Sequence, residues 1–136
     1  MQLSGKCLCG TVRYRSVLPS AFMGKCYCTD CSNESGTRHI TTIAVPDAGL
    51  SIEGAMSDYT KTADSGHRLT RYFCTQCGST LFTRPEQLAG LVVIRAGALD
   101  DRSVIEPQLQ IYVSRAPAWD RPDPNVTSFA EMATQW

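Results

Sequence analysis

The sequence predicts one small domain built mainly from β-strands, and three observations lead to this fold class. The chain has 136 residues, the usual size for a single hydrophobic core. Short segments rich in β-branched and aromatic residues recur along most of it, separated by Gly and Pro. No window of about 12 residues shows the apolar period of an amphipathic helix. We therefore expect strands joined by turns, with little helix.

Seven segments have strand character. The first carries Val12 and Tyr14 on one face, and the sixth contains the apolar run from Leu91 to Ile94 that is typical of a buried strand. In chain order the expected strands are residues 11–16, 40–45, 50–52, 68–74, 79–84, 91–97 and 109–113. The breaks between them fall at Pro46, Gly54, Gly66, Pro85 and Pro107.

Helix is expected at only two places. Residues 85–90 could form one turn between a proline and a glycine, and residues 128–133 could form a short helix with Ser128 as its N-cap. We expect residues 1–119 to form the domain and residues 120–136 a C-terminal tail. The prolines of residues 117–126 favour an extended path over the surface, with Trp119 as its anchor.

Charge and hydropathy exclude several classes of protein. The 13 basic and 13 acidic residues cancel, and no basic cluster is present to attract nucleic acid. No apolar segment approaches the roughly 20 residues that span a bilayer, and the first residues do not resemble a secretion signal. We therefore expect a cytoplasmic protein that binds neither membranes nor nucleic acid. In a reducing compartment, cysteines more often bind metals or catalyse reactions than form disulfides.

The seven cysteines divide into four and three. Cys74 and Cys77 form a Cys-x-x-Cys turn followed by Gly78, as in a zinc knuckle, and "CLCG" offers a second pair in Cys7 and Cys9. Joining these distant segments through one ion would stabilise the fold. We expect a closed structural zinc site with these four thiolate ligands.

The remaining cysteines, Cys26, Cys28 and Cys31, supply only three ligands. Three protein ligands and an open position distinguish catalytic zinc from structural zinc. An open zinc can hold a substrate thiol as thiolate or polarise a carbonyl group, which indicates sulfur or aldehyde chemistry.

Other interpretations remain open on spacing alone. Cys7 or Cys9 could close the triplet instead, or a fourth ligand could come from Asp30, His39 or His67. A thioredoxin-like pair at "CTQC" would need a strand followed by a helix, which this segment does not predict. Disulfides are a further alternative.

The ordered motifs "GKCLCGTVRY", "CYCTDC", "YFCTQCGSTLF", "IRAGALDD" and "IYVSRAPAW" resemble the glutathione-dependent formaldehyde-activating enzyme family, whose domain also occurs in centromere protein V. The resemblance implies stacked antiparallel sheets of the β-tent, rubredoxin-like type. It also implies two zinc ions, divided among the cysteines as above. The family activity is the condensation of formaldehyde with glutathione to S-hydroxymethylglutathione, a carbon–sulfur lyase reaction in reverse.

This chain departs from the family pattern at two places. Tyr27 replaces the usual His between the first two cysteines of the triplet, and a phenol is a poor base at neutral pH. The loop after Cys31 reads "SNESG" and lacks the basic residues that would recognise a carboxylate, and Glu34 is expected to repel one. Positive charge could come from other directions, although we expect each of these side chains to be exposed: Lys25, Arg38, Arg71 and Arg95. We expect the strand aromatics to be core residues rather than cavity walls: Tyr14, Tyr72, Phe73, Phe82 and Tyr112.

The leading hypothesis is a zinc-dependent carbon–sulfur lyase or synthase that joins a glutathione-like thiol to formaldehyde or another small aldehyde. Its catalytic residues would be Cys26, Cys28 and Cys31, with Tyr27 or a water molecule completing the proton transfers. The alternative is a non-catalytic binding module in which both zinc ions are structural.

Overall fold

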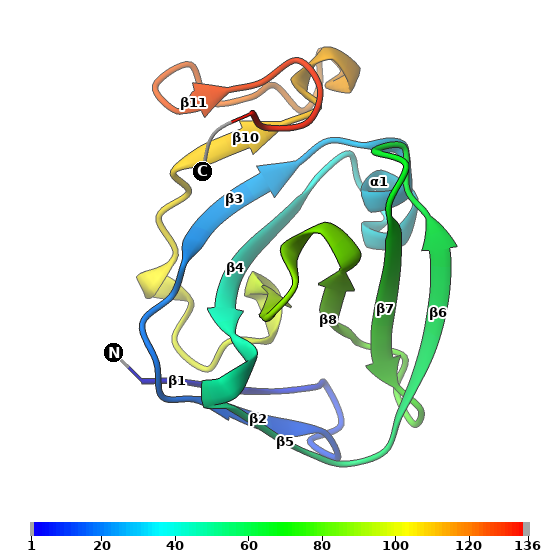
Figure 1. Ribbon diagram of the computed structural model, residues 1–136, viewed down its shortest axis with the longest axis vertical. Coiled ribbons are helices and arrows are strands. Elements are labelled where there is room, and N and C mark those ends of the chain that lie inside the picture. Colours follow the sequence, from blue (N-terminus) through cyan, green and yellow to red (C-terminus); the bar gives the residue numbers. More distant parts are fainter. Residues whose placement is uncertain (1, 135–136) are drawn as a thin grey trace.

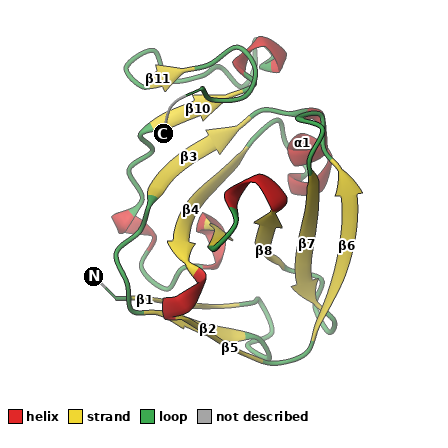
Figure 2. Cartoon of the chain, viewed as in Figure 1, coloured by secondary structure: helices red, strands yellow, loops and turns green. Residues whose placement is uncertain are grey.

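The computed structural model describes residues 2–134 and shows two β-sheets packed against each other (Figure 1, Figure 2). Strands account for most of the regular structure, so the prediction of a mainly β fold with stacked, largely antiparallel sheets is confirmed. Within the described residues, no helix is long and apolar enough to cross a membrane.

The smaller sheet contains β1 (Leu3–Lys6), β2 (Arg13–Ser16) and β5 (Leu50–Glu53), all antiparallel. It crosses one end of the larger sheet, at the bottom of the view in Figure 1. Gly5 is required in β1, because a Cβ there would lie 2.2 Å from both the Ala98 carbonyl oxygen and the Tyr14 hydroxyl. This close approach lets the two sheets share one core.

The larger sheet has eight strands in the order β11-β10-β3-β4-β9-β8-β7-β6. Neighbours are antiparallel except that β10 runs parallel to β3 and to β11. The strands are β3 (Phe22–Cys26), β4 (Ile40–Pro46), β6 (Met56–Thr62), β7 (Arg68–Cys74), β8 (Thr80–Pro85), β9 (Leu91–Arg95), β10 (Leu109–Ile111) and β11 (Thr127–Ser128). Single-turn 3₁₀ helices occupy Asp47–Gly49, Glu86–Leu88, Ala96–Ala98, Arg102–Val104 and Val113–Arg115.

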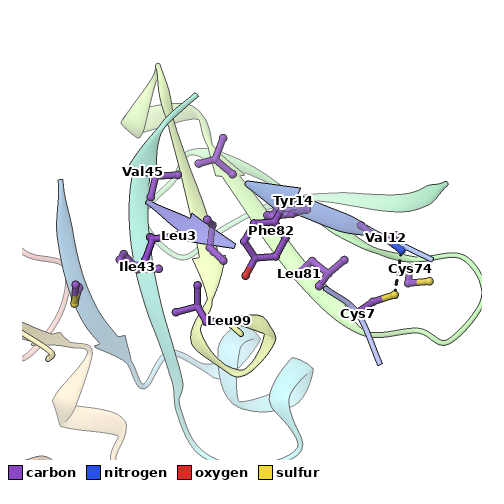
Figure 3. Packing of buried hydrophobic residues seen from close by; sticks show 13 residues of the cluster. Leu3, Cys7, Val12, Tyr14, Ile43, Val45, Cys74, Leu81, Phe82 and Leu99 are labelled. Atoms are coloured by element: carbon purple, nitrogen blue, oxygen red, sulfur yellow. Dashed lines mark hydrogen bonds between the residues drawn. The ribbon is translucent and has the colours of Figure 1, made fainter. Parts of the chain in front are cut away.

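The core lies between the two sheets. Ile43 of β4 and Ile94 of β9 are fully buried there, and Tyr14 of the small sheet meets Phe82 edge to face with ring centroids 5.1 Å apart. Figure 3 shows Cys7 and Cys74 at one edge of these packed side chains. Because side chains alternate along a strand, Thr42, Val93 and Arg95 are directed to the other face of the large sheet.

One α-helix interrupts the strands. Helix α1 (Thr29–Ser35) begins where the Cys28 sulfur accepts a hydrogen bond from the Cys31 N–H at 3.3 Å, and it ends at Gly36 with φ of +76°. Its sequence, "TDCSNES", is poor in strong helix formers, so the sequence did not predict it.

All seven expected strands are present, but β1, β3, β6 and β11 were not expected. β1 and β3 each contain a glycine, and β6 is an exposed edge strand with no apolar alternation. The turn expected at residues 85–90 is confirmed as the 3₁₀ helix Glu86–Leu88.

The prediction of a helix at residues 128–133 is wrong. The backbone of this segment instead forms hydrogen bonds with the chain around β10: Phe129 N–H donates to the Gln110 carbonyl at 2.9 Å, and Tyr112 N–H donates to the Glu131 carbonyl at 2.9 Å. Trp119 is 69% exposed, so its expected role as an anchor is also wrong. The buried Gln110 amide anchors the segment instead, because it forms hydrogen bonds with both the N–H and the carbonyl of Asp123.

Candidate functional site

Four cysteines from distant parts of the chain meet at one edge of the core. Cys7 and Cys9 follow β1, Cys74 ends β7, and Cys77 lies in the turn to β8. All four sulfurs lie within 4.8 Å of one another, and Cys9 Sγ is 3.6 Å from Cys7 Sγ and 3.7 Å from Cys74 Sγ. Sulfurs about 2.3 Å from a tetrahedral zinc ion would be about 3.8 Å apart. This set, here called the four-thiol group, could therefore hold a metal ion.

Backbone N–H groups are aimed at these sulfurs. Cys7 Sγ accepts from Val12 N–H at 3.2 Å, and Cys74 Sγ accepts from Gln76 N–H at 3.3 Å. The Ser79 hydroxyl lies 3.1 Å from Cys77 Sγ, and hydrogen bonds from Ser79 lower the pKa of Cys77 to about 5. Such donors stabilise thiolates, the form in which cysteine binds metals.

The other three cysteines gather at the C-terminal end of β3. Cys26 ends that strand, Cys28 caps α1 and Cys31 lies in the first turn of the helix. Their sulfurs also lie within 4.8 Å of one another, and they are here called the three-thiol group. It could hold a second metal ion with three protein ligands. All seven cysteines are free, so the disulfide alternative is not observed among the described residues.

No fourth ligand joins the three-thiol group from the described part of the chain. His39 Nδ1 lies 2.6 Å from the Asp120 carboxylate, and the Asp30 carboxylate accepts from Lys61 Nζ at 2.6 Å. His67 lies in the turn between β6 and β7 and belongs to neither group. Cys7 and Cys9 are placed in the four-thiol group, so neither closes the triplet.

The three thiols share charge unequally. The pKa of Cys28 is lowered to about 2, chiefly by hydrogen bonds from Cys26 and Cys31 and also by the positive charge of Arg71. The pKa of Cys26 is raised because it donates to Cys28 and Cys31, and that of Cys31 is raised to about 12. Cys28 is therefore the sulfur of this group that is best placed to carry negative charge.

The three-thiol group opens onto a cavity of about 120 Å³. The face of the large sheet opposite the core forms its floor, with Thr42, Arg95, Thr83 and Arg71 contributed by four successive strands. Most of the remaining lining is apolar, as in many small-molecule sites.

Two arginines and one glutamate form a buried ion cluster in this cavity wall. Arg95 donates from Nε and Nη2 to Glu34 Oε1 at 2.8 and 2.6 Å, and Arg71 Nε donates to Glu34 Oε2. The side chains of Arg71, Arg95 and Glu34 are only 11%, 9% and 11% exposed. The expectation that both arginines are exposed is therefore wrong, and the Glu34 carboxylate is engaged by them rather than free to repel an anion.

The other two basic candidates lie differently. Arg38 is half-buried and donates to Ser32 Oγ at 2.7 Å and to the Arg115 carbonyl at 2.9 Å, so it braces α1 against a loop. Lys25 is half-buried beside the cavity. Its exposure is thus intermediate rather than full.

Tyr27 lies behind the three-thiol group rather than on the cavity wall. The residue is fully buried, and its ring stacks at a tilt against His39 with centroids 5.1 Å apart. Burial, and then the negative charge of Asp120, raise its pKa to about 12. Its hydroxyl is therefore neutral and remote from a molecule in the cavity.

The aromatic expectations are mixed. Tyr14 and Phe82 are core residues, and Tyr72 packs against that core. Tyr112 instead lines the cavity, in the left-handed conformation with φ of +57°. Neither this cavity wall nor the ion cluster was predicted from the sequence. The signal available for Arg95 was its place in phase with Val93 at the end of a buried strand, where a charged side chain needs a partner.

Comparisons with known proteins agree with this geometry. Residues 2–115 match the family model described as glutathione-dependent formaldehyde-activating enzyme. A protein of Halomonas elongata provisionally named as such an enzyme is 31% identical over 88% of this chain and 80% of its own length. A protein of Aspergillus flavus with the same provisional name is 32% identical over 65% of this chain, which spans about half (48%) of that relative.

A crystal structure of a Rhodobacter sphaeroides protein superposes with a TM-score of 0.60, covering 76% of this chain and 96% of the other at 19% identity. At this identity the likeness supports the fold alone. The match to the family model covers most of the chain and includes both cysteine groups. The chain therefore belongs to the glutathione-dependent formaldehyde-activating enzyme family.

Proposed function

We propose that the protein is a zinc-dependent carbon–sulfur lyase or synthase that joins a thiol to formaldehyde or another small aldehyde at the three-thiol group. The observation that carries the proposal is the position of Cys26, Cys28 and Cys31 on a cavity wall, with no fourth ligand from the described residues. A metal held there would keep one coordination position facing the cavity. The family's name supports the choice of glutathione and formaldehyde as first substrates to test.

In this proposal the two cysteine groups divide the work. Cys7, Cys9, Cys74 and Cys77 would hold a structural zinc, and Cys26, Cys28 and Cys31 would hold the catalytic one. When bound at the open site, zinc would supply the positive charge that keeps a substrate thiol deprotonated at neutral pH. Free thiols suit the reducing cytoplasm that the sequence analysis proposed.

The bond changes balance without an oxidant or reductant. The thiolate sulfur attacks the aldehyde carbon, a carbon–sulfur bond forms, and the carbonyl π electrons move to oxygen. That oxygen then takes a proton equivalent to the one lost by the thiol. The cavity wall holds both reactants close together and limits the water around them.

We assign the final proton transfer to water rather than to Tyr27. The Tyr27 side chain is fully buried and does not line the cavity, so direct contact with substrate would require it to move. Its proposed role is to support the loop that carries Cys26 and Cys28, through its packing on His39.

The test follows exchange between glutathione and its formaldehyde adduct by NMR, with zinc content measured on the same sample. We expect acceleration that is lost in Cys28→Ser while the protein stays folded. No acceleration with two zinc ions bound would contradict the proposal for these substrates. Replacing glutathione by other thiols, and formaldehyde by other small aldehydes, would extend the test.

A further inference from the structure

We propose that the guanidinium of Arg71 is a carboxylate-binding site inside the cavity, so that one of the two substrates carries a carboxylate within a few bonds of its reacting atom. The identity of the reacting atoms rests on the proposed function, whereas the carboxylate site rests on the cavity itself. Neither formaldehyde nor a simple neutral thiol would use it.

Arg71 has hydrogen-bond donors that no described residue uses. Its Nε is bonded to Glu34, and its two terminal nitrogens make no hydrogen bond with the described residues. Nη1 of Arg95 also has no hydrogen-bond partner among the described residues, but this atom is buried away from solvent. The terminal nitrogens of Arg71 are not buried in this way. Arg71 lines the cavity, so its free edge is the accessible one. A guanidinium edge with two parallel N–H groups matches a carboxylate.

The ion cluster of the cavity wall has two arginines and only one carboxylate. Glu34 balances only one of the two arginines that it contacts. The other acids that line the cavity, Asp30 and Asp64, are paired with Lys61 and Arg115. The remaining positive charge therefore has no carboxylate partner of its own among the described side chains, although it also acts on the Cys28 sulfur. Burial strengthens its attraction for an anion compared with a charge in water.

Glu34 fixes the guanidinium of Arg71 beside the three-thiol group. Glu34 and Cys31 are separated by one helical turn on the same face of α1. Because Glu34 accepts from Arg71 Nε and from Arg95 at the same time, it holds Arg71 in one orientation. An anion on the free edge would thus lie next to the three-thiol group.

The size of the cavity limits the ligand. A volume of about 120 Å³ is well below the roughly 300–1,000 Å³ that encloses a drug-sized molecule. It would enclose a small oxo acid or the reacting end of a longer thiol, the rest of which would extend out of the cavity. The carboxylate could belong to the aldehyde or to the thiol, and the chemistry that recognises it is the same.

The experiment measures binding to the zinc-loaded protein without turnover. Glyoxylate represents the acidic aldehyde and mercaptoacetate the acidic thiol, and each is titrated by calorimetry into the unchanged protein and into Arg71→Lys. The lysine keeps the positive charge but lacks the two parallel N–H donors of a guanidinium. We therefore expect whichever acid uses the site to bind at least about tenfold more weakly. The matched control is Arg84→Lys, whose arginine pairs with Asp47 outside the cavity and should leave both affinities unchanged.

A second measurement does not depend on how the variant folds. With the unchanged protein, mercaptoacetate is compared with its methyl ester, and glyoxylate with its methyl ester. We expect the acid to bind at least about tenfold more tightly than the ester in one of these pairs. Equal binding of acid and ester in both pairs would overturn the proposal, as would equal binding by the unchanged protein and Arg71→Lys.

The same data separate this proposal from the proposed function. Carboxylate binding through Arg71 without any acceleration of carbon–sulfur bond formation would contradict the function and leave the binding site standing. Equal acceleration of carbon–sulfur bond formation for the acids and their methyl esters would support the proposed function and contradict the carboxylate site. In that case the charge of Arg71 would serve only to balance the thiolates.

Discussion

The two cysteine groups use the same ligand chemistry in opposite surroundings. The four-thiol group joins the segment after β1 to the turn between β7 and β8, and two of its members, Cys7 and Cys74, are core residues. The three-thiol group is local to one turn of chain and faces a cavity. The role of a thiolate site is thus set by which segments its ligands connect and by what the remaining coordination position faces.

The largest effect expected is on folding. Cys74→Ser removes a fully buried ligand from the four-thiol group, which ties the small sheet to the large one. Because metal binding at such a site contributes directly to the free energy of folding, we expect the melting temperature to fall by about 20 °C or more. Circular dichroism melts with parallel zinc analysis would measure it. A melting temperature close to that of the unchanged protein would remove the structural role from this group.

Glu34 tests whether the cavity wall depends on its ion cluster. Glu34→Ala would leave two buried guanidiniums without their shared carboxylate, so we expect a loss of about 3–5 kcal/mol in the free energy of unfolding. Denaturant titration would measure the loss. The matched control is Asp47→Ala, which breaks the exposed pair with Arg84 and should change stability by about 1 kcal/mol or less.

The third prediction separates the two groups directly. Cys28→Ser removes a ligand from a site that holds no distant segments together, so we expect the protein to remain folded with a stability loss of about 2 kcal/mol or less. Zinc stoichiometry should fall by one ion, and acceleration of the thiol and aldehyde reaction should disappear. If Cys28→Ser and Cys74→Ser were equally unstable, both sites would be structural and the protein would fit the binding-module alternative.

The smallest effect concerns the turn of the four-thiol group. Gly78 has φ of +76°, and nothing lies within 4 Å of the position that a Cβ would occupy. Gly78→Ala should therefore lower stability by about 1 kcal/mol through backbone strain alone. Thermal melts would measure it, with zinc content unchanged. Loss of a zinc ion in this variant would mean that the turn geometry controls the site more tightly than the strain suggests.

The cysteine groups could be predicted from the sequence because the spacings that indicate them lie within short motifs. Cys-x-Cys and Cys-x-x-Cys spacings with a following glycine favour metal-binding turns, and the structure brings the predicted partners together. The strands were predictable where apolar residues alternate or run together, as in β4 and β9.

The cavity could not be predicted from the sequence, because it depends on contacts between distant segments of the chain. Whether Arg71 and Arg95 face water or an enclosed space depends on which face of the large sheet is covered, and this is decided by pairing between distant strands. The same holds for residues 129–131, whose backbone bonds to the β10 region outcompete a local helix. Helix α1 was missed because its cap is a cysteine, which ordinary capping rules do not include.

If both cysteine groups hold zinc, the two sites should be unequal, one enclosed by protein and one open to the cavity. Native mass spectrometry of the zinc-loaded protein during graded chelation tests it most directly, with Cys28→Ser to identify the site that empties. We expect two zinc ions, of which one leaves first under mild chelation while the protein stays folded, and Cys28→Ser should hold only the ion that leaves more slowly. Two ions that leave together, or a Cys28→Ser protein that still binds both, would contradict it.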